Sequence, residues 1–430
     1  MFRCIAETME SSELDRATDL SGLRHYCDQR TSRDKHASHV FSHGWMPSVL
    51  AKSEGSSASN QPVQVRVVFC WIEASSYMAA CWRSLAARPD MDVHVVHLRR
   101  FSPESPNRFL ADPCLLEGIS HEMFSPDVPD RNRRLLNAVA KRQPHVVILC
   151  GWLYRPYCRI VKSRELERSR VVVGMDSPWR GTVAQRLARF RLAGLVKRVD
   201  LAVTAGDRSY RYARNIGVPE NRIRSGYYGF DNQLFCGVAS ERLVAAGGWP
   251  RQFLFVGRYV PDKDLATLVK AYSLYRTSVS RPWGLTCCGA GVDAELLKGI
   301  TGVVDAGFIP PRELPSVFRG HGAFVLPSLF EPWGVVIAEA AASGLPVVCT
   351  TACGAGVDLV RPYYNGLTVT AQDVPGLARA MRWIHEHESE LASMGQRSQA
   401  LAQPYSADAW ATRWYNYFRD LLADATPHVA

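Results

Sequence analysis

Residues 323–344 read AFVLPSLFEPWGVVIAEAAASG and combine a strand signal, a turn and a helix signal. The apolar run over 323–326 predicts a buried strand, and the alanine-rich segment that ends at Gly344 predicts a helix. Two carboxylates, Glu331 and Glu339, flank the helix start at a spacing of about 12 Å along a helix. A glycosidase pair stands about 5–9.5 Å apart. This spacing suits a longer ligand, with hydroxyls at both ends and negative charge facing the helix amides.

Short β-branched runs alternate with helical patterns from Gln61 onward, which favours parallel sheets with crossover helices. The first set of expected strands is Val65–Phe69, Val93–Leu98, His145–Cys150, Arg170–Gly174 and Leu201–Thr204. After a break over 226–235, the second set is Phe253–Val256, Leu285–Cys288, Ala323–Leu326 and Val347–Thr350. The fold class is therefore α/β, with two facing Rossmann-like domains and a ligand crevice between the carboxyl ends of their strands.

The predicted organisation has four parts. Residues 1–60 are polar and end in a serine-rich linker, so we expect a flexible arm, in which His36, His39 and His43 are incidental rather than a metal site. Residues 61–235 and 236–405 are the expected N-terminal and C-terminal domains. Aromatic residues at helical spacing predict that 406–430 contain a helix that packs back on the N-terminal domain, with a membrane-facing helix as the less favoured alternative. These residues are Trp410, Trp414, Tyr417, Phe418 and Leu421.

Composition and charge narrow the class of protein. The 430 residues are 47% apolar but hold no run of about 18 apolar residues, so we expect no transmembrane helix. Scattered cysteines without a CxxC pair favour reduced thiols in the cytoplasm. The net charge of +10 is concentrated over 130–225. This basic region is either a solvated face or a contact for anionic lipid headgroups or a lipid-diphosphate acceptor; without a nucleic-acid-binding motif, nucleic acid is the least favoured partner.

A second motif, FLFVGRYVPDKDL over 253–265, also passes from a strand through a glycine into a helix. Arg258 at the strand exit and Lys263 at the helix start are expected to point into the crevice. Two fixed cations there suit a diphosphate and its charge as it departs, although two exposed surface cations are the plainer alternative. The Gly289-Ala290-Gly291 stretch after the next strand allows close backbone approach, which alone is weak evidence.

Together these stretches resemble the retaining glycosyltransferases of family GT4, which have the GT-B fold. The resemblance covers roughly residues 61–425 and is strongest over 253–370. It rests on the element around Gly257, Arg258 and Lys263, on DAGFI (305–309), LPS (326–328), the Glu331–Glu339 element with ASGLPVV (342–348), and NGL (365–367). Several dispersed matches in one order are more specific than any one of them.

The resemblance implies a role for each matched residue. Arg258 and Lys263 would bind the diphosphate of a nucleoside diphosphate sugar. Glu331 would hold the donor sugar, and Glu339 would hold the ribose. The remaining donor contacts implied by the family are Gly257 in the strand-exit element, the amides of Gly334, Val335 and Val336 near sugar or phosphate, and the backbone around Phe308 and Ile309 near the base.

The N-terminal half departs from the family pattern. Many relatives have a glycine-rich loop after the first strand, whereas this chain reads CWIEASSY over 70–77, with Glu73 as an acceptor-side candidate. Many relatives place a histidine near the transferred sugar, whereas this chain reads GMDSPW over 174–179. Asp176 is predicted to touch the donor sugar or to position the acceptor hydroxyl. Capping of the following helix is the alternative for this residue.

The expected activity is retaining transfer of a hexose-like sugar from a nucleoside diphosphate sugar to a sugar or lipid-linked acceptor. The family and the basic region suggest bacterial polysaccharide or glycolipid synthesis, in the cytoplasm or at the inner face of the membrane. No Asp-x-Asp cluster stands beside a phosphate site, so neither a metal nor another cofactor is expected. A dinucleotide oxidoreductase is disfavoured because GxGxxG is absent. A catalytically silent nucleotide-binding scaffold or interaction protein remains the alternative.

Overall fold

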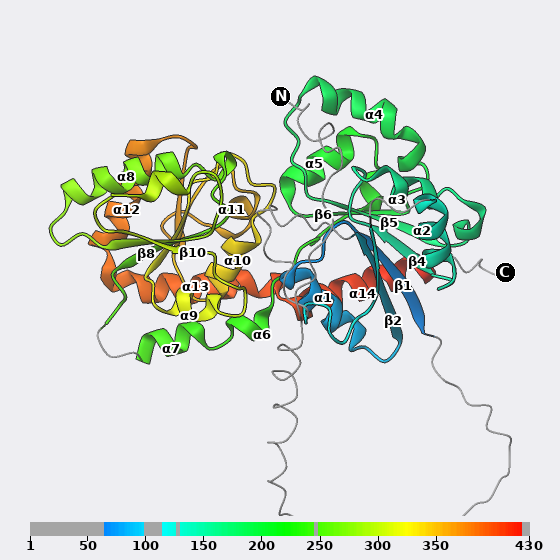
Figure 1. The fold of residues 1–430 in the computed structure, drawn as a ribbon, viewed down its shortest axis with the longest axis horizontal. Helices are drawn as coiled ribbons and strands as arrows, with labels where there is room; N and C mark the ends of the chain where they lie inside the picture. Colours follow the sequence, from blue (N-terminus) through cyan, green and yellow to red (C-terminus); the bar gives the residue numbers. More distant parts are fainter. Residues whose placement is uncertain (1–63, 99–113, 126–129, 245–247, 424–430) are drawn as a thin grey trace, which may run out of the picture. The chain divides into compact units, whose positions relative to one another are not determined.

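The computed structural model describes residues 64–98, 114–125, 130–244 and 248–423 (Figure 1). These residues belong to the second of two units into which the chain divides, 1–60 and 61–430. The predicted arm, its three histidines and residues 424–430 lie outside the described ranges. No helix within the described ranges is both long enough and apolar enough to cross a bilayer.

The N-terminal domain is built on a parallel sheet that has seven strands among the described residues, in the order β3-β2-β1-β4-β5-β6-β7. The strands are β1 (Val65–Trp71), β2 (Met91–Leu98), β3 (Ser120–Phe124), β4 (Val146–Leu149), β5 (Arg170–Met175), β6 (Leu201–Thr204) and β7 (Ile223–Ser225). All five predicted strands are confirmed. The edge strands β3 and β7 were missed because, unlike the inner strands, they are largely polar and exposed.

Alternate residues of β1 enter two separate apolar layers, as expected for a sheet covered on both faces. Val67 and Phe69 pack with α1 and α14, whereas Val68 and Cys70 pack with the helices of the other face. The helices of the N-terminal domain are α1 (Ser76–Ala86), α2 (Arg131–Ala140), α3 (Arg155–Ile160), α4 (Val183–Val196) and α5 (Asp207–Asn215), with 3₁₀ turns η2 (Arg164–Leu166) and η3 (Glu220–Arg222).

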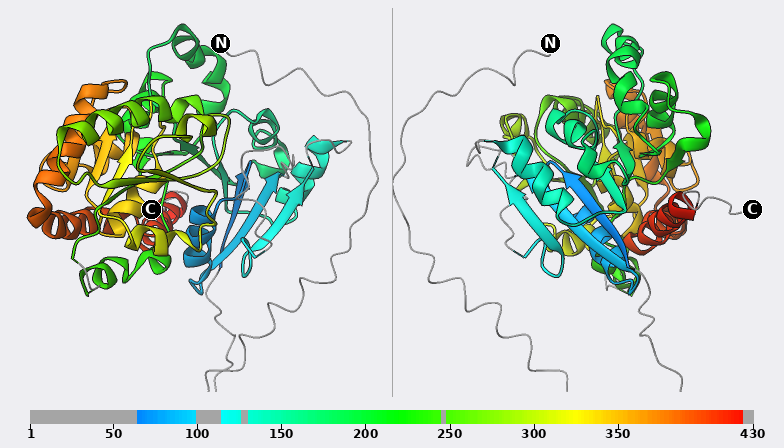
Figure 2. Two further views of the ribbon diagram at one scale, coloured as in Figure 1. Left: turned by 60° about the vertical axis from the view of Figure 1, so that its left-hand side comes forward. Right: turned by 90° about the vertical axis from the view of Figure 1, so that its right-hand side faces the viewer.

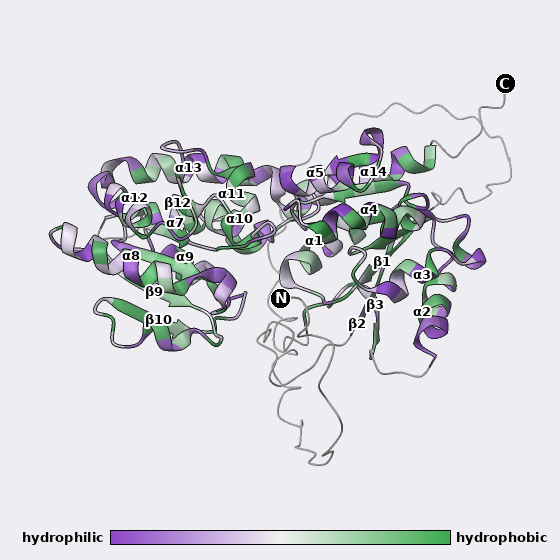
Figure 3. Cartoon of the chain, turned by 90° about the horizontal axis from the view of Figure 1, so that it is seen from above, coloured by the Kyte–Doolittle hydropathy of each residue, from purple (hydrophilic) through white to green (hydrophobic). Residues whose placement is uncertain are grey.

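The C-terminal domain repeats this plan with six parallel strands among the described residues, in the order β10-β9-β8-β11-β12-β13. They are β8 (Gln252–Val256), β9 (Gly284–Cys288), β10 (Val303–Gly307), β11 (Ala323–Leu326), β12 (Val347–Thr350) and β13 (Gly366–Val369). The four predicted strands are confirmed, and the two additional ones, β10 and β13, are again the edges. Hydrophobic residues concentrate along the strands of both sheets (Figure 3).

Helices and short turns cover both faces of the second sheet. The helices are α6 (Asn232–Phe235), α7 (Val238–Val244), α8 (Leu265–Ser278), α9 (Leu314–Arg319), α10 (Val335–Ala342), α11 (Gly354–Leu359), α12 (Val374–Glu386) and α13 (Leu391–Ala402). They are followed by α14 (Ala407–Ala423), which belongs to the other domain. The 3₁₀ turns are η4 (Pro261–Lys263), η5 (Ala294–Leu297), η6 (Glu388–Glu390) and η7 (Gln403–Tyr405). Although α6 precedes position 236, it contacts α10 of the second domain.

The final helix, α14, returns to the N-terminal domain and packs beside α1 (Figures 1 and 2). Trp410, Trp414 and Phe418 are fully buried there. The indole of Trp410 donates to the Tyr227 carbonyl at 2.9 Å, and that of Trp414 donates to the Gly226 carbonyl at 3.0 Å. Because 226–227 lie in the predicted break, the helix also fixes the segment that joins the two domains. The predicted return of this helix is therefore present.

Candidate functional site

A cleft of about 400 Å³ opens where strands of both sheets end. Its walls follow the carboxyl ends of β1 and β5 in one domain and of β8 and β11 in the other, the position expected for ligands of doubly wound sheets. The residues predicted from the sequence that line it are Glu73, Asp176, Gly257, Arg258, Lys263, Glu331, Gly334, Val335, Val336 and Glu339. Phe308 and Ile309 follow β10 and are not part of this lining; Pro311 and Leu314 line it instead.

The loop before α10 is shaped by Gly334. This residue begins the helix with φ +99°, a left-handed conformation that favours glycine, and a Cβ there would lie 2.9 Å from Cγ of Glu331. The helix start has no side-chain cap and no acidic residue in its first turn. Its early amides, including those of Val335 and Val336, can therefore face an anion in the cleft.

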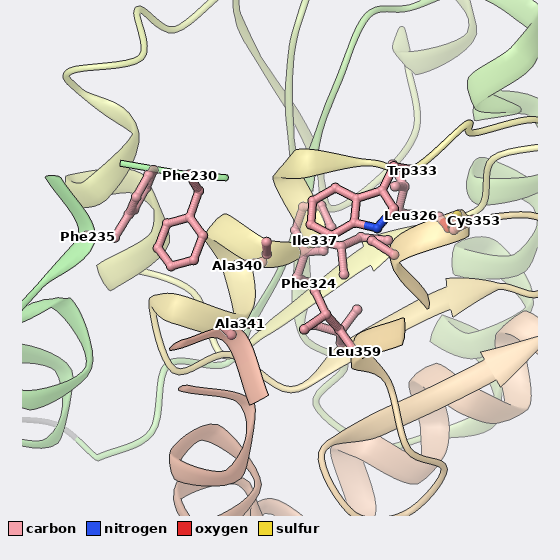
Figure 4. Packing of buried hydrophobic residues seen from close by; sticks show 14 of the residues in the cluster. Phe230, Phe235, Phe324, Leu326, Trp333, Ile337, Ala340, Ala341, Cys353 and Leu359 are labelled. Carbon is pink, nitrogen blue, oxygen red and sulfur yellow. Dashed lines mark hydrogen bonds between the residues drawn. The ribbon is translucent and has the colours of Figure 1, made fainter. Parts of the chain in front are cut away.

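The buried face of α10, which packs on the sheet, holds the helix in place. Ile337, Ala340 and Ala341 are fully buried beside Phe324 and Leu326 of β11 (Figure 4). Burial of a side chain the size of Ile337 contributes about 1.5–3 kcal/mol. The small alanines allow close packing, so the helix start has little freedom to move relative to the sheet. The predicted geometry, with Glu331 before the helix and Glu339 within it, is confirmed.

Lys263 and Glu331 form an ion pair across the cleft floor, and each side chain is only 12% exposed. The backbone holds their two loops together, because the Asp262 carbonyl accepts from the Leu329 amide at 2.8 Å and from the Phe330 amide at 3.3 Å. The sequence assigned these two side chains to different parts of a ligand and did not predict their contact. The ion pair therefore fixes the direction of the Lys263 side chain before any anion binds.

Arg258 is exposed at the exit of β8, between two anchored residues. The Gly257 amide donates to the Cys288 carbonyl at 3.0 Å, and the Tyr259 amide donates to the Ala290 carbonyl at 2.8 Å. This close approach explains Gly289, since a Cβ there would lie 1.9 Å from the Gly257 carbonyl oxygen. Arg258 therefore stands exposed on a fixed backbone, which suits a group that closes on a phosphate.

Glu339 is half-buried in the same cleft, and desolvation together with nearby Asp231 raises its pKa to about 7. The carboxyl group is thus a proton donor below neutral pH and an acceptor above it. Asp231 begins α6, where its side chain accepts from the Leu234 amide at 3.2 Å. The segment that joins the domains consequently influences the charge of this cleft residue.

Glu339 should make the stability of the protein depend on pH. Its pKa rises from an ordinary 4.5 to about 7 on folding, so the folded chain binds this proton more tightly than the unfolded chain. The contribution of this group to the free energy of unfolding should therefore fall as the pH rises from 4.5 to about 7. Thermal unfolding at pH 5, 6, 7 and 8 should show that Glu339→Gln loses this part of the dependence. Equal pH profiles for the two proteins would contradict the raised pKa.

Asp176 occupies the wall contributed by the N-terminal domain, directly after β5. Its carboxylate accepts from the Tyr228 hydroxyl at 2.9 Å and from the Ser177 hydroxyl at 3.3 Å. The alternative role, capping of the following helix, is wrong, because Thr182 caps α4 by accepting from the Gln185 amide. Asp176 therefore faces the cleft as a carboxylate oriented by two hydroxyl groups.

Three aromatic residues of the cleft were not identified as site residues from the sequence. Tyr228 stands 5.8 Å, between ring centroids, from both Tyr77 of α1 and Trp333 of the loop before α10. Burial and the proximity of Asp176 keep the pKa of Tyr228 well above its ordinary value, so its hydroxyl remains a donor. The only sequence signal was a pair of tyrosines between two glycines in the break over 226–235.

The part of the chain that forms the C-terminal side of the cleft matches a known protein family. Residues 250–387 match the family model described as glycosyl transferases group 1. The match contains Arg258, Lys263, Glu331 and Glu339, the four charged residues that the C-terminal domain contributes to the cleft.

Curated relatives match part of the chain. Glycogen synthase of Mycobacterium tuberculosis is 30% identical over 172 residues, which are 38% of this chain and 40% of that protein. D-inositol 3-phosphate glycosyltransferase of Corynebacterium aurimucosum is 30% identical over 118 residues, which are 27% of this chain and 28% of that protein. The matched region thus spans less than half of either relative.

Solved structures match across both domains. HepE of Anabaena in complex with UDP and glucose has a TM-score of 0.64 at 17% identity, and the alignment covers 83% of this chain and all of that one. Sucrose-phosphate synthase of Thermosynechococcus elongatus has a TM-score of 0.62 at 19% identity, with coverage of 84% and 100%. The two-domain GT-B fold predicted from the sequence is therefore confirmed.

Proposed function

We propose that the chain transfers a sugar from a nucleoside diphosphate sugar to an acceptor hydroxyl, as a GT4 enzyme that retains anomeric configuration. The observation that carries the proposal is one cleft that joins two cations, Arg258 and Lys263, to the exposed start of α10 and to Glu331 and Glu339. This arrangement combines two cations and free helix amides with carboxylates that can accept hydrogen bonds. A nucleoside diphosphate sugar has the complementary pattern.

The start of α1 also faces the cleft, through Ser75, Ser76 and Tyr77. Two helix N-termini, one from each domain, therefore direct partial positive charge at the same space. As the sugar leaves the diphosphate, negative charge grows on the departing oxygen and positive charge on the sugar ring. The negative charge is stabilised by Lys263, Arg258 and the α10 amides. The positive charge on the ring can be stabilised by Glu331 and Asp176.

Closure of the two domains would bring the remaining groups together and exclude water, which limits hydrolysis of the donor. The joining segment is suited to this motion because Tyr228 contacts both walls, through Asp176 on one side and Trp333 on the other. A change in the spacing of the walls therefore changes the surroundings of this one ring.

The two cations also bear on the need for a metal. Many diphosphate sites use a divalent cation for charge neutralisation, whereas here Arg258 and Lys263 supply two positive charges within the cleft. We therefore propose that no metal takes part. Transfer at full rate in the presence of EDTA would support this, and loss of activity that Mg²⁺ or Mn²⁺ restores would overturn it.

The experiment that tests the function starts with ligand protection. Thermal unfolding with UDP, GDP, ADP and their sugars should reveal one nucleotide that raises the unfolding temperature, because a ligand that binds only the folded state stabilises it by mass action. The selected donor is then incubated with sugar and lipid-linked acceptors, and the anomeric configuration of the product is read by NMR. Binding without transfer or hydrolysis would favour the silent scaffold instead.

The basic N-terminal domain bears on the class of acceptor. We propose a sugar or lipid-linked acceptor in polysaccharide or glycolipid synthesis, reached in the cytoplasm or at the inner face of the membrane. The support is the basic N-terminal domain, in which α2, α3 and α4 carry exposed arginines. Comparison of soluble and vesicle-embedded acceptors would decide between the two classes.

A further inference from the structure

Helix α4 carries an apolar stripe on its outer surface. Val183, Leu187 and Phe190 are 72%, 52% and 75% exposed, although the helix is well formed and capped. Together with Gly194 they recur at intervals of four, three and four residues, which places them on one face. Single exposed apolar residues are ordinary, but an aligned set on one helix indicates a contact surface.

The inner face of α4 satisfies the needs of the fold without that stripe. Ala188 and Leu195 are buried in the apolar layer beneath the helix, and Leu192 and Val196 pack against its margin. Gln185 ties the helix start to the preceding loop by accepting from the Arg180 amide at 2.7 Å. Exposure of the outer stripe therefore does not stabilise the isolated domain, because it leaves the Phe190 ring in water.

Basic residues flank the apolar stripe of α4. Arg186 and Arg191 lie about 70° to either side of it at 3.6 residues per turn, and the helix contains no acidic residue. An apolar stripe with basic flanks is the pattern of helices that lie in the interface of an anionic bilayer. A partner protein or a second copy would need an apolar surface with acidic flanks.

A basic hollow of about 440 Å³ adjoins the end of the same helix. Lys162, Arg164 and Lys197 contribute exposed positive charge to its lining, and Glu167 is the one acid there. The Lys162 ammonium lies 3.3 Å from the position that a Cβ of Gly194 would occupy, so the hollow is continuous with the stripe. A phosphate headgroup fits this position beside a helix that inserts into the acyl boundary.

We propose that α4 docks the protein on an anionic phospholipid surface, with Val183, Leu187 and Phe190 inserted and the basic hollow in contact with headgroup phosphate. The loop from Asp176 to Thr182 joins the cleft to this helix, and the Arg180 guanidinium stands 5.2 Å from the centroid of the Phe330 ring, beside Glu331. Docking would thus hold the acceptor-side wall of the cleft at the bilayer surface, where a lipid-linked acceptor resides.

Co-sedimentation of the full chain with vesicles tests the proposal. The protein should bind phosphatidylcholine vesicles that contain about one third phosphatidylglycerol, and should bind pure phosphatidylcholine much more weakly. Phe190→Gln should lower binding about ten-fold or more. The double variant Arg186→Gln/Arg191→Gln should lower it about 25-fold, at about five-fold for each charge.

Two substitutions in the other domain serve as matched controls. Leu274→Gln on α8 removes a leucine that is 46% exposed, and Arg379→Gln on α12 removes an arginine with a 72% exposed side chain. Neither should change vesicle binding. Equal binding to both vesicle types, or α4 variants that bind like the controls, would overturn the proposal.

Sedimentation velocity separates a lipid from a protein partner. An oligomer that Phe190→Gln dissociates, in a protein that does not bind vesicles, would also overturn the proposal and make the stripe an interface between copies. Vesicle binding is measured without donor or acceptor. Its failure is therefore a separate result from failure of the proposed transferase activity.

Discussion

Lys263→Ala is expected to lower the rate of sugar transfer by about 100- to 1,000-fold, the effect of removing one fixed charge-stabilising group from a reaction centre. In the cleft the lysine is 12% exposed and is directed by Glu331 and by the hydrogen bonds of its loop. It therefore meets the departing diphosphate without first losing side-chain freedom. Initial rates of transfer at saturating donor measure the loss, and full activity in this variant would contradict the diphosphate role.

The same substitution has an effect on stability that must be separated from catalysis. Removal of Lys263 leaves the Glu331 carboxylate largely buried without its partner, which costs at most about 3–5 kcal/mol. Adding Glu331→Gln removes that unpaired charge, so the double variant should regain stability but not activity. Lys270→Ala on α8 is the matched control, because this exposed lysine lies outside the cleft lining. It should match the wild type in both measurements.

The inner strands and the donor side of the site were predictable because local sequence dictates them. Parallel strands that are buried on both faces are apolar where they are buried, so β4 and β11 are apolar throughout, and β1 and β8 are apolar over 67–71 and 253–256. The positions of Arg258, Lys263 and Glu331 follow from one rule, that residues just after such strands gather at the carboxyl edge of the sheet. Each residue could be placed from its own strand alone.

What the sequence did not predict depends on contacts between distant segments. The edge strands β3, β7, β10 and β13 have a neighbour on only one side, so their sequences need not be apolar. Tyr228 became a site residue only because α14 and the end of β4 position the segment that joins the domains, through hydrogen bonds to Tyr227. The pairing of Lys263 with Glu331 likewise needs two loops to meet across 68 positions of sequence. No periodicity within a single segment encodes such contacts.

The apolar stripe of α4 was missed for another reason. The sequence located an excess of basic residues over 130–225 but could not show which faces were exposed. An amphipathic pattern predicts that the apolar face is buried, whereas here both faces contain apolar residues and the sheet takes only one. The exposed stripe becomes visible only after Ala188 and Leu195 are placed in the core.

Asp176→Asn is expected to lower transfer by about 100-fold or more, within the range for a group that positions or accepts a proton in the reaction. The asparagine keeps the shape of the side chain and can still accept from Tyr228, so the fold should be retained. Nucleotide protection against thermal unfolding should stay at the wild-type level, because the diphosphate contacts lie on the other wall of the cleft. Asp420→Asn, an exposed substitution on α14, is the matched control.

Donor hydrolysis decides which of the two predicted roles Asp176 has. If Asp176 positions the acceptor hydroxyl, Asp176→Asn should lose transfer but keep slow hydrolysis of the donor, in which water replaces the acceptor. If the carboxylate contacts the donor sugar, both rates should fall together. Tyr228→Phe removes one hydrogen bond to Asp176 and leaves the charge, so it should have a smaller effect, about 10-fold. Transfer by Asp176→Asn at the wild-type rate would exclude either role, and the acceptor side of the cleft would then have to depend on Glu73 or Tyr77, which line the same wall.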